Sequence, residues 1–130
     1  MKKSLSVVGC PPATQDVLVN LKNRGWAIRN VAYGPPNPAL RNEAYWASLA
    51  KEWGTSTATA RTMRCGNCAA FNVSPRIRKC IEMGVGGPAG DVDQFIAAGQ
   101  LGYCTAFHFK CAASRTCRAW VAGGPITVEK

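Results

Sequence analysis

The chain has 130 residues, of which 47% are hydrophobic and 18% are charged. This length fits one ordinary domain or a short arm with a small domain, and the composition excludes a chain that is disordered throughout. Sixteen lysines and arginines against seven acidic residues give a formal net charge of +9, which suits an approach to nucleic acid or to an acidic partner. No segment has the roughly 18 consecutive apolar residues of a membrane span, so we expect no membrane partner.

The first part of the chain predicts a strand and a helix. Residues 1–13 are expected to be a tail or to contain a lone strand at residues 5–8 that the following prolines end. We expect Thr14 to cap a helix that ends at Gly25, because the apolar spacing between them is helical. Residues 26–33 fit either a strand or a helix. The apolar face of the predicted helix would contain Val17, Leu18 and Leu21.

A proline-rich break and a second helix follow. The segment Gly34-Pro-Pro-Asn-Pro38 excludes regular helix. The next helix is expected from about Pro38 to Trp53, with Gly54 ending it. Three aromatic residues of this half are candidate partner-binding residues, because large rings anchor interfaces. They are Tyr33, Trp46 and Trp53.

The second half predicts short elements separated by loops. Ser74 and Pro75 favour a helix through Met83, and residues 91–99 favour one or two further helical turns. The expected fold is mostly α with long loops and little β. It divides into a docking arm (residues 1–62), a small cysteine-rich metal-cluster domain (63–124) and a tail (125–130).

Six of the seven cysteines fall within 53 consecutive residues, and this clustering is the most informative chemical signal. Disulfide bonds hold many small secreted domains together, but the odd number of cysteines and the Cys65-x-x-Cys68 pair favour a metal. In the disulfide alternative Cys80 and Cys111 would pair. Cys10 is expected to play no part.

Zinc and an iron–sulfur cluster are the two metal alternatives. A four-thiolate zinc site usually uses two Cys-x-x-Cys pairs, whereas this chain has one, and its only histidine, His108, excludes a site of two cysteines and two histidines. We expect His108 to point outward from a strand. A cluster is larger than one ion, so its ligands can be more dispersed, in an apolar pocket. Aromatic side chains adjoin the candidate ligands: Phe71, Tyr103, Phe107, Phe109 and Trp120.

Three segments resemble the ligand turns of high-potential iron–sulfur proteins. Cys65-Gly-Asn-Cys68-Ala-Ala-Phe71 resembles the first, and Gly102-Tyr-Cys104-Thr-Ala-Phe107 and Cys117-Arg-Ala-Trp120 resemble later ones. The resemblance implies a 4Fe–4S cluster bound by Cys65, Cys68, Cys104 and Cys117. A second alignment replaces the last of these by Cys80, and Cys111 is a further alternate.

Other segments are similar to small bacteriophage-encoded proteins. They are Tyr33-Gly-Pro-Pro-Asn-Pro38, the Asn42-x-x-Tyr45-Trp46 helix through Trp53, Arg64 to Phe71, and Arg115 to Trp120. This resemblance implies a virion component that is made in the host cytoplasm and assembles, as an oligomer, with other phage proteins. Together the resemblances imply a virion structural protein whose C-terminal half folds around a chiefly structural 4Fe–4S cluster.

Two alternative functions remain open. The first is a one-electron carrier of the high-potential type, in which the basic first half would face an acidic partner. The second is a zinc-stabilised nucleic-acid-binding protein that uses the basic surface. We do not expect an enzyme, because one histidine supplies no Ser/His/Asp set.

Overall fold

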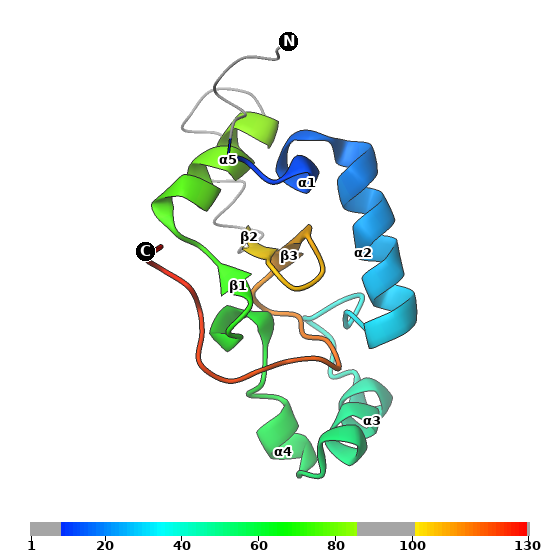
Figure 1. The fold of residues 1–130 in the computed structure, drawn as a ribbon. Helices are drawn as coiled ribbons and strands as arrows, with labels where there is room; N and C mark the ends of the chain where they lie inside the picture. The colour runs from blue at the N-terminus through cyan, green and yellow to red at the C-terminus, as the bar shows by residue number, and fades with distance from the viewer. Residues whose placement is uncertain (1–8, 86–100, 130) are drawn as a thin grey trace.

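The computed structural model describes residues 9–85 and 101–129 (Figure 1). Helices predominate beside a small sheet, so the predicted mostly α class with little β is confirmed. The strand predicted at residues 5–8 and the helical turns predicted at 91–99 lie outside the described residues. The elements are α1 (Pro12–Gln15), α2 (Val17–Val31), α3 (Glu43–Trp53), α4 (Thr57–Ala60), the 3₁₀ turn η2 (Cys65–Asn67), β1 (Phe71–Asn72), α5 (Pro75–Val85), β2 (Leu101–Cys104) and β3 (Phe109–Ala112).

The sheet lies at the centre of the molecule, with α2 along one side (Figure 1). Its three antiparallel strands have the order β1-β2-β3. Helices α1 and α5 lie at one end of the molecule and α3 and α4 at the other. The register pairs Phe71 with Cys104 on one side of β2, and Gly102 with Cys111 on the other. This small sheet therefore brings cysteines from different segments close together.

Helix α2 begins later and ends later than the sequence predicts. Asp16 caps it, since its carboxylate accepts the N–H groups of Leu18 at 2.9 Å and Val19 at 3.4 Å, whereas Thr14 lies in α1. Gly25 does not end the helix, because a glycine inside a helix costs only about 1 kcal/mol and the helix continues to Val31.

The apolar face expected on this helix does not point inward. Val17, Leu18 and Leu21 are 63%, 73% and 55% exposed. The buried side of α2 instead carries Asn20 and Ala27. The carboxamide oxygen of Asn20 accepts the backbone N–H of Lys110 at 2.7 Å, so a polar side chain fixes α2 against β3.

Helix α3 is shorter than predicted at its start. The side chain of Asn37 accepts the N–H of Ala39 at 3.1 Å, which forms a turn, and the helix begins only at Glu43. Gly54 ends it in a left-handed conformation with φ of 67°, as predicted.

Two of the three predicted partner-binding aromatics are buried. Trp46 is 1% exposed and Tyr33 is 6% exposed. Tyr33 packs edge-on against Phe109 with ring centroids 4.8 Å apart, and its hydroxyl accepts the N–H of Ala112 at 3.0 Å. The third, Trp53, is half-buried and donates its indole N–H to the Arg118 carbonyl at 3.0 Å.

The predicted docking arm shares a hydrophobic core with the cysteine-rich half. Ala27 and Tyr33 belong to the same buried cluster as Cys65, Phe71 and Phe109. Residues on both sides of the boundary expected near residue 62 therefore contribute to one buried cluster. Within the described residues, no helix is long and apolar enough to cross a membrane.

The end of the chain is also packed, although the sequence predicts a tail from residue 125. The backbone of Ile126 accepts from Val73 at 2.8 Å and donates to Phe71 at 2.7 Å. Glu129 then forms an ion pair with Arg76 of α5 at 2.9 Å. Backbone pairing with β1 and this ion pair hold the C-terminal segment against the fold.

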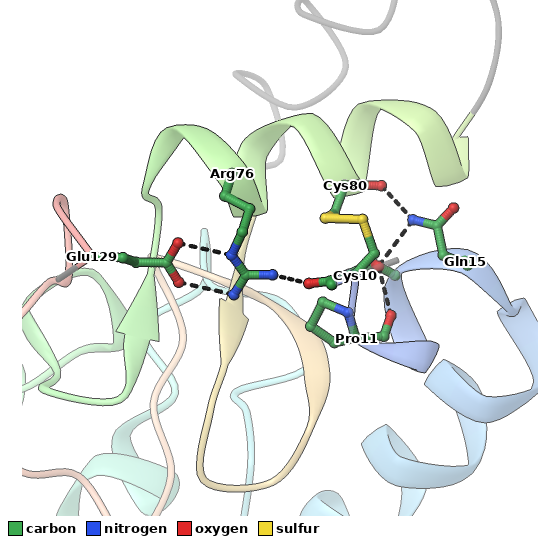
Figure 2. The surroundings of a disulfide bond; sticks show 8 residues. Cys10, Pro11, Gln15, Arg76, Cys80 and Glu129 are labelled. Atoms are coloured by element: carbon green, nitrogen blue, oxygen red, sulfur yellow. Dashed lines mark hydrogen bonds and ion pairs between the residues drawn. A yellow bond between two sulfur atoms is a disulfide. The ribbon is translucent and has the colours of Figure 1, made fainter. Parts of the chain in front are cut away.

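A disulfide bond ties the N-terminal segment to the same helix. Cys10 is bonded to Cys80 of α5, 70 residues further along the chain (Figure 2). The side chain of Gln15 donates to the Cys80 carbonyl at 2.8 Å, and Arg76 donates to the Gly9 carbonyl. Helix α5 thus binds segments from both ends of the chain.

Candidate metal centre

Five cysteines of the described residues carry free thiols, and all five line one cavity. They are Cys65, Cys68, Cys104, Cys111 and Cys117. They come from four places in the chain: η2 and the residue after it, the end of β2, the middle of β3 and the loop after β3. Ala70, Phe71 and Trp120 complete the lining. The cavity is small, with about 20 Å³ of space open to the centre of a water-sized sphere, and it is partly open to solvent.

Backbone hydrogen bonds place the Cys65 to Cys68 turn against the loop after β3. The N–H of Cys65 donates to the Arg115 carbonyl at 2.6 Å, and the N–H of Gly66 donates to the Ala113 carbonyl at 3.0 Å. Within the turn, the Cys68 N–H donates to the Cys65 carbonyl at 2.9 Å. This tight turn lets two thiols three positions apart line the same cavity.

The β2–β3 turn positions Cys104. The backbone N–H of Phe107 donates to the Cys104 sulfur at 3.4 Å, and the N–H of Ala106 also interacts with that sulfur. His108 occupies the turn with a φ of 62° and is exposed. The prediction that His108 points outward is confirmed, although it lies in a turn and not on a strand.

The loop after β3 positions Cys117 and closes the site with an indole ring. The N–H of Ala119 interacts with the Cys117 sulfur. The Trp120 indole N–H donates to the Arg64 carbonyl and to the Asn67 side chain, each at 2.9 Å. These bonds connect the loop to the turn that carries the first two thiols.

Burial holds several of these thiols in their neutral form. It raises the pKa of Cys117 to about 12. The backbone N–H of Ala119 acts in the opposite direction and lowers this pKa, whereas the neighbouring cysteines raise it further. It also raises the pKa of Cys104 and of the fully buried Cys111, whose thiol contacts Cys65. A metal that binds here must displace protons, because thiolates and not thiols are metal ligands.

Cys80 lies elsewhere, so three expectations about it and Cys10 need correction. The Cys80 sulfur is bonded to Cys10 and is not available as a cluster ligand, as the second alignment would require. It does not pair with Cys111, whose thiol is free. Cys10 is not a bystander. No spacing rule identifies a bond across 70 residues, since disulfide connectivity cannot be deduced from sequence alone.

The cavity offers thiol donors, but the described residues contain no ready-made site for a metal ion. In zinc sites each sulfur lies about 2.3 Å from the metal, but no group of three or more histidine, cysteine, aspartate or glutamate side chains in residues 9–85 and 101–129 is arranged to hold a metal ion. The five thiols line one small cavity that is partly open to solvent. Its lining residues are cysteines, two aromatic residues and an alanine, and thiol ligands in apolar surroundings are typical of iron–sulfur sites.

Comparisons with protein-family models, with curated proteins and with solved structures found no match to this chain.

Proposed function

We propose that this protein binds a 4Fe–4S cluster in the cavity of five thiols, and that the cluster is chiefly structural. Cys65, Cys68, Cys104 and Cys117 are the proposed ligands, with Cys111 as the alternate. The convergence of free thiols from four chain segments on one cavity supports the proposal most directly. When bound, the cluster would supply four metal–sulfur cross-links.

The surrounding structure favours a structural role. The sheet that positions the thiols has strands of two to four residues, which is too little to be stable alone. Cys65 and Cys68 lie in and directly after the short turn η2, and Cys117 lies in the loop after β3. Metal–ligand bonds between such segments would contribute directly to the free energy of folding.

Metal and sulfide analysis of anaerobically purified protein tests the proposal. We expect about four irons and four acid-labile sulfides per chain and a brown colour, as a 4Fe–4S cluster requires. Chemical destruction of the cluster should then unfold the C-terminal half. A colourless protein with one zinc per chain would support the zinc alternative, and protein without iron, sulfide or zinc would contradict both.

Cysteine variants test the ligand set. Replacement of Cys65, Cys68, Cys104 or Cys117 by alanine should abolish iron binding, whereas Cys111→Ala should retain it. The Cys10→Ser/Cys80→Ser double variant is the matched control, because these sulfurs lie outside the cavity. If Cys111→Ala loses iron while Cys117→Ala keeps it, Cys111 is the fourth ligand.

A one-electron carrier is the second candidate function. The backbone N–H groups that face the Cys104 and Cys117 sulfurs favour it, because hydrogen bonds to sulfur tune the reduction potential of a cluster. Reversible reduction and oxidation without loss of fold would support this function. A cluster that decays on its first redox cycle would leave the structural role.

The proposed setting is a phage virion, in which the protein assembles with other virion proteins. The likeness of several segments to small phage-encoded proteins supports this setting. Mass spectrometry of purified particles from a phage that encodes the chain tests it. Detection at a fixed copy number per particle would support a structural component, and absence from the particles would contradict it.

A further inference from the structure

A second concave site is lined in part by Tyr33 and shares no lining residue with the thiol cavity. It is a groove of about 230 Å³ between α2, β2, β3 and the loop that follows. The residues that line this cationic groove are Arg24, Tyr33, Leu101, Lys110, Ala112 and Arg115. Half of them are cationic and none is acidic.

The two arginines of the groove are held around the Tyr33 ring. The guanidinium carbons of Arg24 and Arg115 lie 5.7 and 5.8 Å from the ring centroid, within the range of cation–π attraction. Arg115 also donates to the Pro36 carbonyl at 3.1 Å. Tyr33 itself is fixed by its hydrogen bond to Ala112. The cationic groups therefore have a defined arrangement.

The positive charge in the groove is not neutralised by the described part of the chain. The ion pairs between described residues use Arg41, Arg61, Arg76 and Arg78, none of which lines the groove. Lys110 is half-buried, and this burial lowers its pKa. Three cations held close together repel one another, so an anion bound among them would be favoured.

We propose that this groove binds a phosphate group through Arg24, Lys110 and Arg115. Guanidinium groups donate paired hydrogen bonds to the oxygens of phosphate, and an ammonium adds a point charge. Three donors from three chain segments suit a group with several charged oxygens. The phosphate is either free inorganic phosphate or a backbone phosphate of nucleic acid. This site does not depend on the cluster.

Binding experiments on the full-length, anaerobically purified protein test the proposal. Isothermal titration calorimetry measures inorganic phosphate, and fluorescence anisotropy measures a labelled single-stranded oligonucleotide without a terminal phosphate. Arg24→Gln/Arg115→Gln should weaken binding about a hundred-fold or more, because the loss of each charged hydrogen-bond donor is expected to cost about ten-fold or more. Lys110→Gln should weaken it too, and Arg24→Lys/Arg115→Lys should bind better than the glutamine variant.

The matched control is Lys51→Gln/Lys79→Gln, which removes two exposed charges of α3 and α5 outside the groove. Saturable binding of inorganic phosphate that only the groove variants weaken supports a site for free phosphate. Binding of the oligonucleotide alone, with the same dependence on the variants, supports a backbone-phosphate site. The proposal is overturned if neither probe binds, or if the control weakens binding as much as the groove variants. Thermal unfolding of every variant identifies those that fail to fold. If the arginine variants fail to fold, Lys110→Gln decides the question, because the Lys110 side chain forms no hydrogen bond or ion pair with a described residue.

Discussion

At the scale of single residues, Trp120 connects the loop of Cys117 to the turn that begins with Cys65. Its ring lines the thiol cavity, and its N–H has two acceptors, the Arg64 carbonyl and the Asn67 side chain. Trp120→Phe would keep an aromatic ring and remove both bonds. We expect it to lower the free energy of unfolding by about 1–2 kcal/mol and to speed the loss of iron in air. Denaturant unfolding and the decay of visible absorbance measure the two effects.

Trp53 supplies the control for this substitution. Its N–H donates to the Arg118 carbonyl at 3.0 Å, and its ring centroid lies 6.3 Å from that of Trp120, but it does not line the cavity. Trp53→Phe should therefore cost about 1 kcal/mol of stability without changing the rate of iron loss. Equal rates of iron loss in the two variants would show that Trp120 does not protect the site.

At the scale of elements, two glycines should respond to alanine with opposite signs. A Cβ on Gly102 of β2 would lie 2.5 Å from the Phe71 ring and 2.9 Å from Val73. Gly102→Ala should therefore displace a ring that lines the thiol cavity and destabilise the fold by about 1–3 kcal/mol. On Gly25 of α2, a Cβ would meet only the end of the flexible Arg29 side chain.

Gly25→Ala should stabilise the protein by about 0.5–1 kcal/mol, since alanine is the better helix former. Urea unfolding measures both changes, and iron content shows whether Gly102→Ala also disturbs the cavity. A stabilising Gly102→Ala would mean that Phe71 moves aside at no cost. The close packing of β1 on β2 would then not be needed to form the site.

The elements also show which features the sequence could predict. Local signals predicted the helix that begins at Pro75 and the end of α3 at Gly54. A proline in the first turn of a helix and a glycine just after its last turn affect only the few residues around them, so they can be read from the sequence. Helix α2 passes Gly25 because contacts with β3, distant in sequence, outweigh a weak local preference. The clustering of cysteines in the sequence indicated that several thiols would lie together, and five of them line one cavity. The bond between Cys80 and Cys10 could not be predicted, because it depends on how distant parts of the chain meet in the fold.

At the scale of the whole molecule, helix α5 holds the C-terminal segment through an ion pair that acid should break. Two hydrogen bonds from Arg76 and one from Asn72 lower the pKa of Glu129 to about 2. A carboxylate with a lowered pKa stabilises the fold above its unfolded pKa, near 4.5, and this contribution is lost as the pH falls through about 2. Because Arg76 is half exposed, solvent screening limits the ion pair to about 1 kcal/mol or less.

Glu129→Gln should therefore unfold more easily than the natural chain at pH 7, and this difference should shrink as the pH falls from about 4.5 to 2. Glu43→Gln is the control, since it changes one carboxylate in an exposed ion pair of α3, far from the chain end. Denaturant titrations across this pH range measure both differences. A difference for Glu129→Gln that is the same at every pH would assign its effect to packing and not to charge.

The disulfide between Cys10 and Cys80 spans more of the chain than the ion pair between Arg76 and Glu129 does, 70 residues against 53. A bond across 70 residues restricts the unfolded chain, and chain-entropy arguments give about 4 kcal/mol for a loop of this size. Cys10→Ser/Cys80→Ser should lower the free energy of unfolding by several kcal/mol. It should leave iron content unchanged, since neither sulfur lines the thiol cavity.

Denaturant unfolding with and without a reducing agent, followed by iron analysis, measures the stability and the iron content. Reduction should destabilise the natural protein to the level of the double variant and leave that variant unaffected. A loss of iron in the double variant would show instead that the two parts of the molecule depend on each other.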